Sequence, residues 1–108
     1  MLQRSNNPRD QARAAGDLSG LASHSADNRV KIVAAGAIPP LVALLGPQSS
    51  ERVQQNAARA LLTLASNNID NCIKIRSHGA VPALNLLLQS TNEDVKSVTR
   101  DVLNMIIG

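Results

Sequence analysis

The sequence predicts an all-α protein, and three observations lead to that class. Segments around Gly36 and Gly79 repeat one another at a spacing of 43 residues. Apolar residues recur at intervals of three and four, which is the spacing of one face of an α-helix. The apolar side chains are all aliphatic or sulfur-containing, because the chain has no Phe, Tyr or Trp. A core of small aliphatic side chains suits closely spaced helices, and no part of the pattern requires a strand.

The repeat extends well beyond its two glycines. The run AGAIPPLVALL, residues 35–45, has its counterpart in HGAVPALNLLL, residues 78–88. One residue is lost in the loop that follows, so Val53 corresponds to Val95 at an offset of 42. A period of about 40–47 residues is typical of solenoids whose units are pairs or triplets of helices.

An unpaired helix is predicted first, over residues 9–23. Its apolar positions Ala14, Leu18 and Leu21 lie on one helical face. It corresponds to the last helix of a preceding unit. Residues 1–8, which come before it, are expected to form a flexible N-terminal segment.

The first full unit, residues 28–66, contains three predicted helices. A short helix ends at Gly36, which suits a left-handed cap. A second helix begins at Pro39, because a proline in the first helical turn removes no intrahelical hydrogen bond. The third and longest helix, about residues 51–66, carries an apolar stripe at Val53, Ala57, Ala60, Leu61 and Leu64.

The second full unit, residues 69–108, repeats this order. Its last helix has a matching stripe at Val95, Val98, Val102, Leu103 and Ile106. The repeat domain as a whole is therefore expected to span residues 9–108.

These residues resemble the armadillo repeat. The resemblance is carried by RVKIVAAGAIPPLVALL, residues 29–45, followed by VQQNAARALLTLA, residues 53–65. HEAT repeats share the period but usually lack the short first helix and the Gly-Ala-Ile-Pro corner. The resemblance implies a right-handed superhelix of stacked helix triplets, whose third helices line a concave groove that binds extended polypeptides.

The resemblance also implies which side chains line this groove, namely those about a third of a turn from the apolar stripes of the long helices. The groove candidates are Arg9 and Arg13, then Arg52, Asn56, Arg59 and Thr63, then Asp94, Val98, Asp101 and Met105, with Gly16 and Gly20 at the remaining positions of the first helix.

The arginines among these candidates resemble the basic groove of catenin-type armadillo proteins, which takes acidic peptides. Guanidinium groups pair bidentately with carboxylates, so the resemblance favours a protein or peptide partner of acidic character. The alternative is that the charges only keep the helix face solvated, since exposed ion pairs contribute little to stability.

Two other partner classes fit the residues less well. Armadillo nuclear-import receptors hold Trp and Asn at the positions of Arg59 and Thr63, whereas this chain has no Trp, which disfavours basic import signals. Nucleic acid is disfavoured because no aromatic side chain is present for base stacking. Asp94 and Asp101 also interrupt the basic positions, and a net charge of +3 is modest.

No pattern of catalytic or metal-binding residues was found, and neither a cofactor nor enzymatic activity is predicted. His24 and His78 lack neighbouring ligands, and Cys72 is the only cysteine. The run GDLSG, residues 16–20, lies inside a helical pattern with no strand before it, unlike a nucleophile elbow. No apolar run approaches the roughly 20 residues of a membrane span. With no secretory leader pattern, the sequence predicts an intracellular setting, cytoplasmic or nuclear.

The alternative to peptide binding is a purely structural role. Terminal units of a solenoid normally carry polar caps. The stretch LNMII, residues 103–107, lacks that character. Its aliphatic flank would then stack on further repeats of a longer armadillo protein or on a second copy, forming a homo-oligomer.

Overall fold

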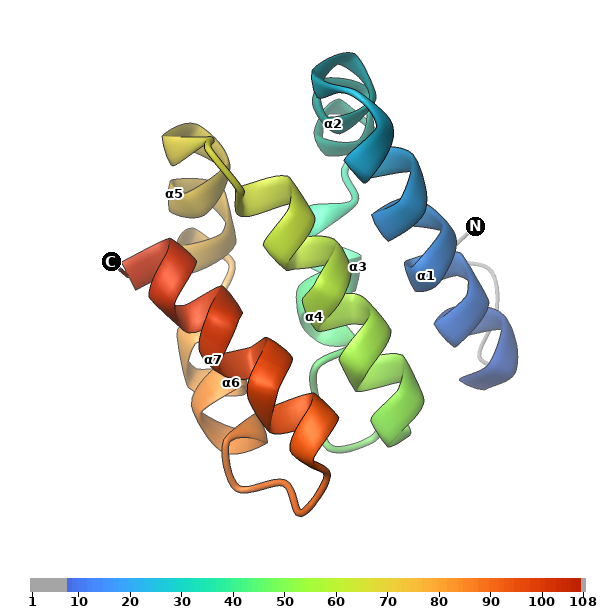
Figure 1. Ribbon diagram of the computed structural model, residues 1–108, viewed down its shortest axis with the longest axis vertical. Helices are drawn as coiled ribbons and strands as arrows, with labels where there is room; N and C mark the ends of the chain where they lie inside the picture. Colours follow the sequence, from blue (N-terminus) through green and yellow to red (C-terminus); the bar gives the residue numbers. More distant parts are fainter. Residues whose placement is uncertain (1–7, 108) are drawn as a thin grey trace.

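The computed structural model describes residues 8–107, with side chains described from Arg13 onward. Over this range the chain forms helices and no strand, which confirms the predicted all-α class (Figure 1). The helices are α1 (Pro8–His24), α2 (Ala26–Ala34), α3 (Ile38–Ala43), α4 (Glu51–Ala65), α5 (Ile69–Ser77), α6 (Ala80–Leu87) and α7 (Glu93–Ile107). Of the segment expected to be flexible, residues 1–7 lie outside the described residues, and Pro8 opens α1.

The helices form two layers. The long helices α1, α4 and α7 lie side by side in one layer, and the shorter helices α2, α3, α5 and α6 lie behind them (Figure 1). Helix α4 is central because it contacts α1 on one side and α7 on the other. These three long helices are the equivalent third helices of successive units, so the structure confirms three helices per repeat.

The corners within each unit are set by glycine. Gly36 follows α2 with φ of 84°, and Gly79 follows α5 with φ of 82°. Both values lie in the left-handed region, where a residue without Cβ is strongly favoured. The prediction of a left-handed cap at Gly36 is therefore confirmed. The following helix starts at once in each unit, with prolines in its first turn.

The units are tied together by a side-chain hydrogen bond that recurs at equivalent positions. Asn28 on α2 donates from Nδ2 to the carbonyl oxygen of Leu21 at 3.0 Å. Its counterpart Asn71 on α5 donates to the carbonyl oxygen of Leu64 at 2.8 Å. Each bond satisfies a carbonyl near the C-terminal end of a long helix, where intrahelical partners run out. The first helix of each unit is thereby held to the third helix of the preceding one.

The core is a single cluster of aliphatic side chains between the two layers. Its largest fully buried members include Leu41, Leu45, Leu61, Leu64, Ile75, Leu84 and Ile106. They come from both layers and both full units. Since small side chains fill this space, the helices approach closely and leave the outer face of the long helices as a broad surface.

Candidate functional site

The exposed face of α1, α4 and α7, called here the long-helix face, carries most of the predicted groove residues. The exposed ones are Arg13 on α1, Arg52 and Arg59 on α4, and Asp94, Asp101 and Met105 on α7. Asn56 and Thr63 are half-buried on α4. Arg9 belongs to α1, but its side chain lies outside the described side chains.

The two exposed arginines of α4 lie on the central helix of this face, which contacts both α1 and α7. Ser50 caps the helix by accepting a hydrogen bond from the Val53 backbone N–H at 3.3 Å. From Arg13 to Ile107, the only ion pair joins Lys96 and Glu93 at 2.9 Å. The guanidinium groups of Arg52 and Arg59 therefore have no carboxylate partner within this part of the chain. They are available for a charge supplied from outside.

Thr63 and Asn56 take part in packing α4 against α1. The Thr63 hydroxyl donates to the Arg59 carbonyl oxygen at 3.0 Å and lies 3.4 Å from the Ser19 hydroxyl of α1. A Cβ placed on Gly16 would lie 3.6 Å from Asn56 Nδ2, an ordinary van der Waals contact. These two side chains therefore lie at the contact between α1 and α4 and not on the most exposed part of the long-helix face.

Val98 departs from the expectation that it lines the groove. Only 8% of its surface is exposed, and it belongs to the aliphatic core. Its counterpart on α4 is the half-buried Asn56, so this register position borders a neighbouring helix. An apolar, β-branched side chain at such a position is drawn inward by burial.

Helix α1 offers only backbone at two of the predicted groove positions. Gly16 and Gly20 occupy the positions that hold Arg59 and Thr63 on α4. A Cβ on Gly20 would meet no heavy atom within 4 Å, so that position opens to solvent. An extended ligand can approach the α1 backbone closely at this point.

A hollow that the sequence reasoning missed lies between α4 and α7. It has a volume of about 530 Å³ and is lined by Leu62, Ser66, Asp101, Asn104 and Met105. We call it the α4–α7 hollow. Leu62, Ser66 and Asn104 were not among the groove candidates. These residues lie further around the helix from the apolar stripe than the positions from which the groove candidates were taken.

Charge is divided across the long-helix face. The α1 and α4 part presents Arg13, Arg52 and Arg59, whereas the α7 part presents Asp94 and Asp101. The sign reverses at equivalent positions, since Arg52 corresponds to Asp94 and Arg59 to Asp101. A ligand crossing all three helices meets a basic region and then an acidic one.

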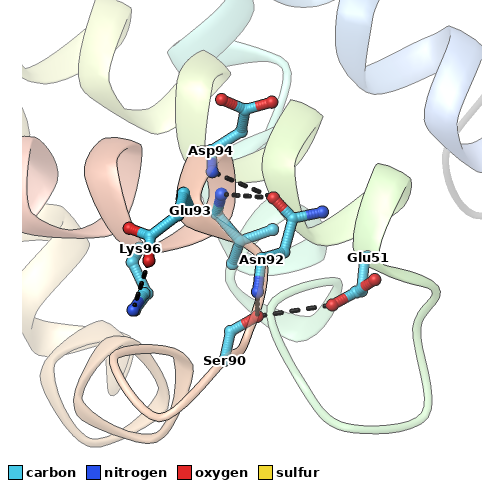
Figure 2. A network of polar contacts seen from close by, with 7 residues as sticks. Glu51, Ser90, Asn92, Glu93, Asp94 and Lys96 are labelled. Carbon is cyan, nitrogen blue, oxygen red and sulfur yellow. Dashed lines mark hydrogen bonds and ion pairs between the residues drawn. The ribbon is translucent and has the colours of Figure 1, made fainter.

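The start of α7 is held by a network of polar contacts around the preceding loop (Figure 2). The Asn92 side-chain oxygen accepts hydrogen bonds from the backbone N–H groups of Asp94 and Val95, at 2.9 and 3.2 Å. Ser90 donates to the Glu51 carboxylate at 3.4 Å. The hydrogen bond and positive charge of Lys96 lower the pKa of Glu93. These contacts hold the first turn of α7, and with it the backbone of Asp94, in a fixed position next to the loop.

A second pocket lies beside this network, at the opposite edge from the α4–α7 hollow. It has a volume of about 580 Å³ and lies where the loops after α3 and α6 approach each other. Its walls are mostly aliphatic, with Leu86 exposed at the rim and Glu51 the one charged lining residue.

Metal ligands and membrane spans were also sought. Among the described side chains, from Arg13 to Ile107, no three of His, Cys, Asp or Glu are grouped as a metal site would require. None of the helices described there combines the length and apolar character that crossing a bilayer demands.

Comparison with known sequences finds two matches. Residues 25–66 match the Armadillo/beta-catenin-like repeat. A stretch of 44 residues, 41% of the chain, is 57% identical to U-box domain-containing protein 13 of Arabidopsis thaliana, and it spans 7% of that protein.

Comparison with solved structures finds the same architecture over nearly the whole chain. Two engineered proteins from the Northeast Structural Genomics Consortium superpose on 96% of it, with TM-scores of 0.88 and 0.89 and identities of 36% and 33%. A designed armadillo repeat protein in complex with the peptide (KR)4 also covers 96% of it, with a TM-score of 0.85 and 30% identity. The chain spans 42%, 43% and 43% of these three structures.

Proposed function

The chain belongs to the armadillo repeat family, and from that premise we propose that it is a non-catalytic interaction module. It binds an extended segment of another protein across the long-helix face. One observation carries the proposal: Arg52 and Arg59 are exposed on the central long helix, with no ion-pair partner among the described side chains. Unpaired guanidinium groups on a surface of this family suit recognition of carboxylates.

The acidic character of the ligand follows from these arginines. A designed relative is known in complex with the peptide (KR)4, which supports peptide binding as the mode. On α1 and α4 this chain presents arginine instead of a surface that would attract such a peptide. Like charges placed opposite one another disfavour a partner strongly. We therefore assign carboxylate-bearing residues to the ligand segment over α1 and α4.

The test is a charge reversal measured by fluorescence anisotropy with a labelled glutamate-rich peptide. The double variant Arg52→Glu and Arg59→Glu should weaken binding at least about tenfold, because each charge-assisted hydrogen bond contributes roughly 1.5–3 kcal/mol before solvent screening. Added salt should weaken binding of the unaltered protein, since screening reduces attraction between exposed charges.

The matched control reverses two lysines of the other layer. Lys31 on α2 and Lys74 on α5 are exposed, and Lys31→Glu with Lys74→Glu makes the same change in net charge. This control should keep most of the affinity. If both doubles lose affinity equally, net charge alone is responsible and the proposal for the long-helix face is wrong.

A structural, self-associating role is the second candidate, and one observation favours it. Ile107 is 59% exposed and Leu88 36% exposed, although their counterparts Ala65 and Leu45 in the middle unit are buried. No helix within residues 8–107 covers this side of the last unit. We propose that a second copy or a further repeat stacks there, which would protect the two side chains from water.

Sedimentation equilibrium at high micromolar concentration tests the stacking role. The stacking proposal predicts a mass above that of the monomer, reduced to the monomer by Leu88→Asp with Ile107→Asp. The same pair of changes should leave peptide binding intact, which separates the two candidates. A monomeric mass for the unaltered chain would contradict self-association.

A further inference from the structure

We propose that the ligand of the long-helix face carries a lysine or arginine beside its acidic residues, and that this basic side chain occupies the α4–α7 hollow against Asp101. The inference rests on the proposed function and specifies its partner more narrowly. The ligand is a charge-segregated segment, acidic over α1 and α4 and basic over α7, instead of a uniformly acidic one.

The lining of the hollow fits a long basic side chain. Leu62 and Met105 supply apolar wall, and Met105 remains 39% exposed. Asp101 supplies the only charged group in the lining, and Ser66 and Asn104 add hydrogen-bonding groups. Lysine and arginine combine an aliphatic stem with a charged end, so they bury the stem along apolar surface while the charge meets a carboxylate.

Asp101 forms no ion pair in the described part of the chain. Between Arg13 and Ile107 the only ion pair is formed by Lys96 and Glu93 near the start of α7. The Asp101 carboxylate is therefore free to pair with a ligand group. The volume of about 530 Å³ leaves space for one long side chain between the helices.

The charge reversal along the face requires a sign change in any ligand that spans it. A carboxylate brought over α7 would face Asp94 and Asp101, and like-charge contacts disfavour such a partner. Arg59 and Asp101 occupy equivalent positions on packed helices, whose axes lie about 8–10 Å apart. An extended chain advances about 3.3 Å per residue, so the acidic and basic residues of the ligand should be about three residues apart.

Synthetic peptides of matched length test this arrangement. One peptide places two lysines three residues after a block of four glutamates, a second replaces both lysines with glutamine, and both are also made in reversed order. In at least one order the lysine peptide should bind about three- to tenfold more tightly than its glutamine counterpart. The variant Asp101→Lys should abolish or reverse that preference, and Asp101→Asn should reduce it.

The control variant is Asp70→Lys on α5, an exposed position in the other layer. It makes the same change in net charge and should keep the preference for lysine. If the preference is absent in both orders, or survives Asp101→Lys unchanged, the inference is wrong while the proposed function stands. If no glutamate peptide binds the unaltered protein, the proposed function and this inference fail together.

Discussion

The middle unit, α2 to α4, and the last unit, α5 to α7, share a sequence pattern but not a pattern of burial. Ala65 is fully buried at the end of α4, whereas its counterpart Ile107 on α7 is 59% exposed. Leu45 is 1% exposed and its counterpart Leu88 is 36% exposed. The difference lies in the neighbours, because α4 is covered on both sides and α7 on one. Burial in a solenoid is a property of the stack rather than of the unit.

The last unit also changes the chemistry of its uncovered side. Val42 and Ala58 in the middle unit correspond to Asn85 and Arg100, and both of these polar residues are exposed. The uncovered side of the last unit is therefore less aliphatic than the stretch LNMII, considered by itself, predicted. Leu88 and Ile107 remain as its apolar part.

The largest expected effect comes from placing a last-unit residue into the middle unit. Ala58 is fully buried, so Ala58→Arg would bury an unpaired charge and overpack the core. We expect it to lower the free energy of unfolding by about 4 kcal/mol or more. The reverse exchange, Arg100→Ala, should change it by less than about 0.5 kcal/mol. Urea unfolding followed by circular dichroism measures both, and equal effects would refute the comparison.

Truncating equivalent leucines should separate the two units next. Leu45→Ala removes a buried side chain and should cost about 3 kcal/mol, within the range known for core truncations. Leu88→Ala removes a partly exposed one, so its cost should stay below about 1 kcal/mol. A stack of identical copies would bury Leu88, so the cost of Leu88→Ala would then rise with protein concentration.

The asparagine that joins successive units provides a smaller contrast. Asn71 is buried, and Asn71→Ala would leave the Leu64 carbonyl without this bond, at a cost of about 2 kcal/mol. Asn28 makes the equivalent bond in a more exposed setting, so Asn28→Ala should cost about 0.5 kcal/mol. Thermal denaturation of the two variants would rank them, and a larger loss for Asn28→Ala would contradict the assigned burial.

The corner glycines should show no contrast. Gly36 and Gly79 have nearly the same positive φ, and a Cβ at either would meet no heavy atom within 4 Å. Gly36→Ala and Gly79→Ala should each cost about 1–2 kcal/mol from backbone strain alone. Because the requirement is local to each unit, equal losses in urea unfolding are expected, and a marked difference would show that neighbouring units contribute.

The smallest effect concerns the long helix α1. Gly20 lies inside this helix in open space, so Gly20→Ala should raise the free energy of unfolding by about 0.5–1 kcal/mol. The same variant adds a methyl group to the long-helix face. Peptide affinity should change little, and a large loss would indicate that the ligand lies directly on the α1 backbone.

The helices and corners were predictable because their signals are local. Apolar spacing along residues 53–64 defines the inward face of α4, and Gly36 indicates a left-handed residue without reference to any other unit. The exposure of Arg52 and Arg59 follows from the same spacing. Val98, however, was assigned both to the apolar stripe and to the groove, and its burial agrees only with the stripe. The periodicity of one helix does not say how far a neighbouring helix covers such a border position.

By itself, the sequence determined the helical class, the repeat of three helices and the residues that form each helix, because backbone geometry and apolar spacing act over a few residues. The tertiary structure decided which equivalent residues are buried, how Thr63 meets Ser19 and where α4 and α7 leave a hollow. Those features depend on distances between separate helices, and only packing in three dimensions sets such distances.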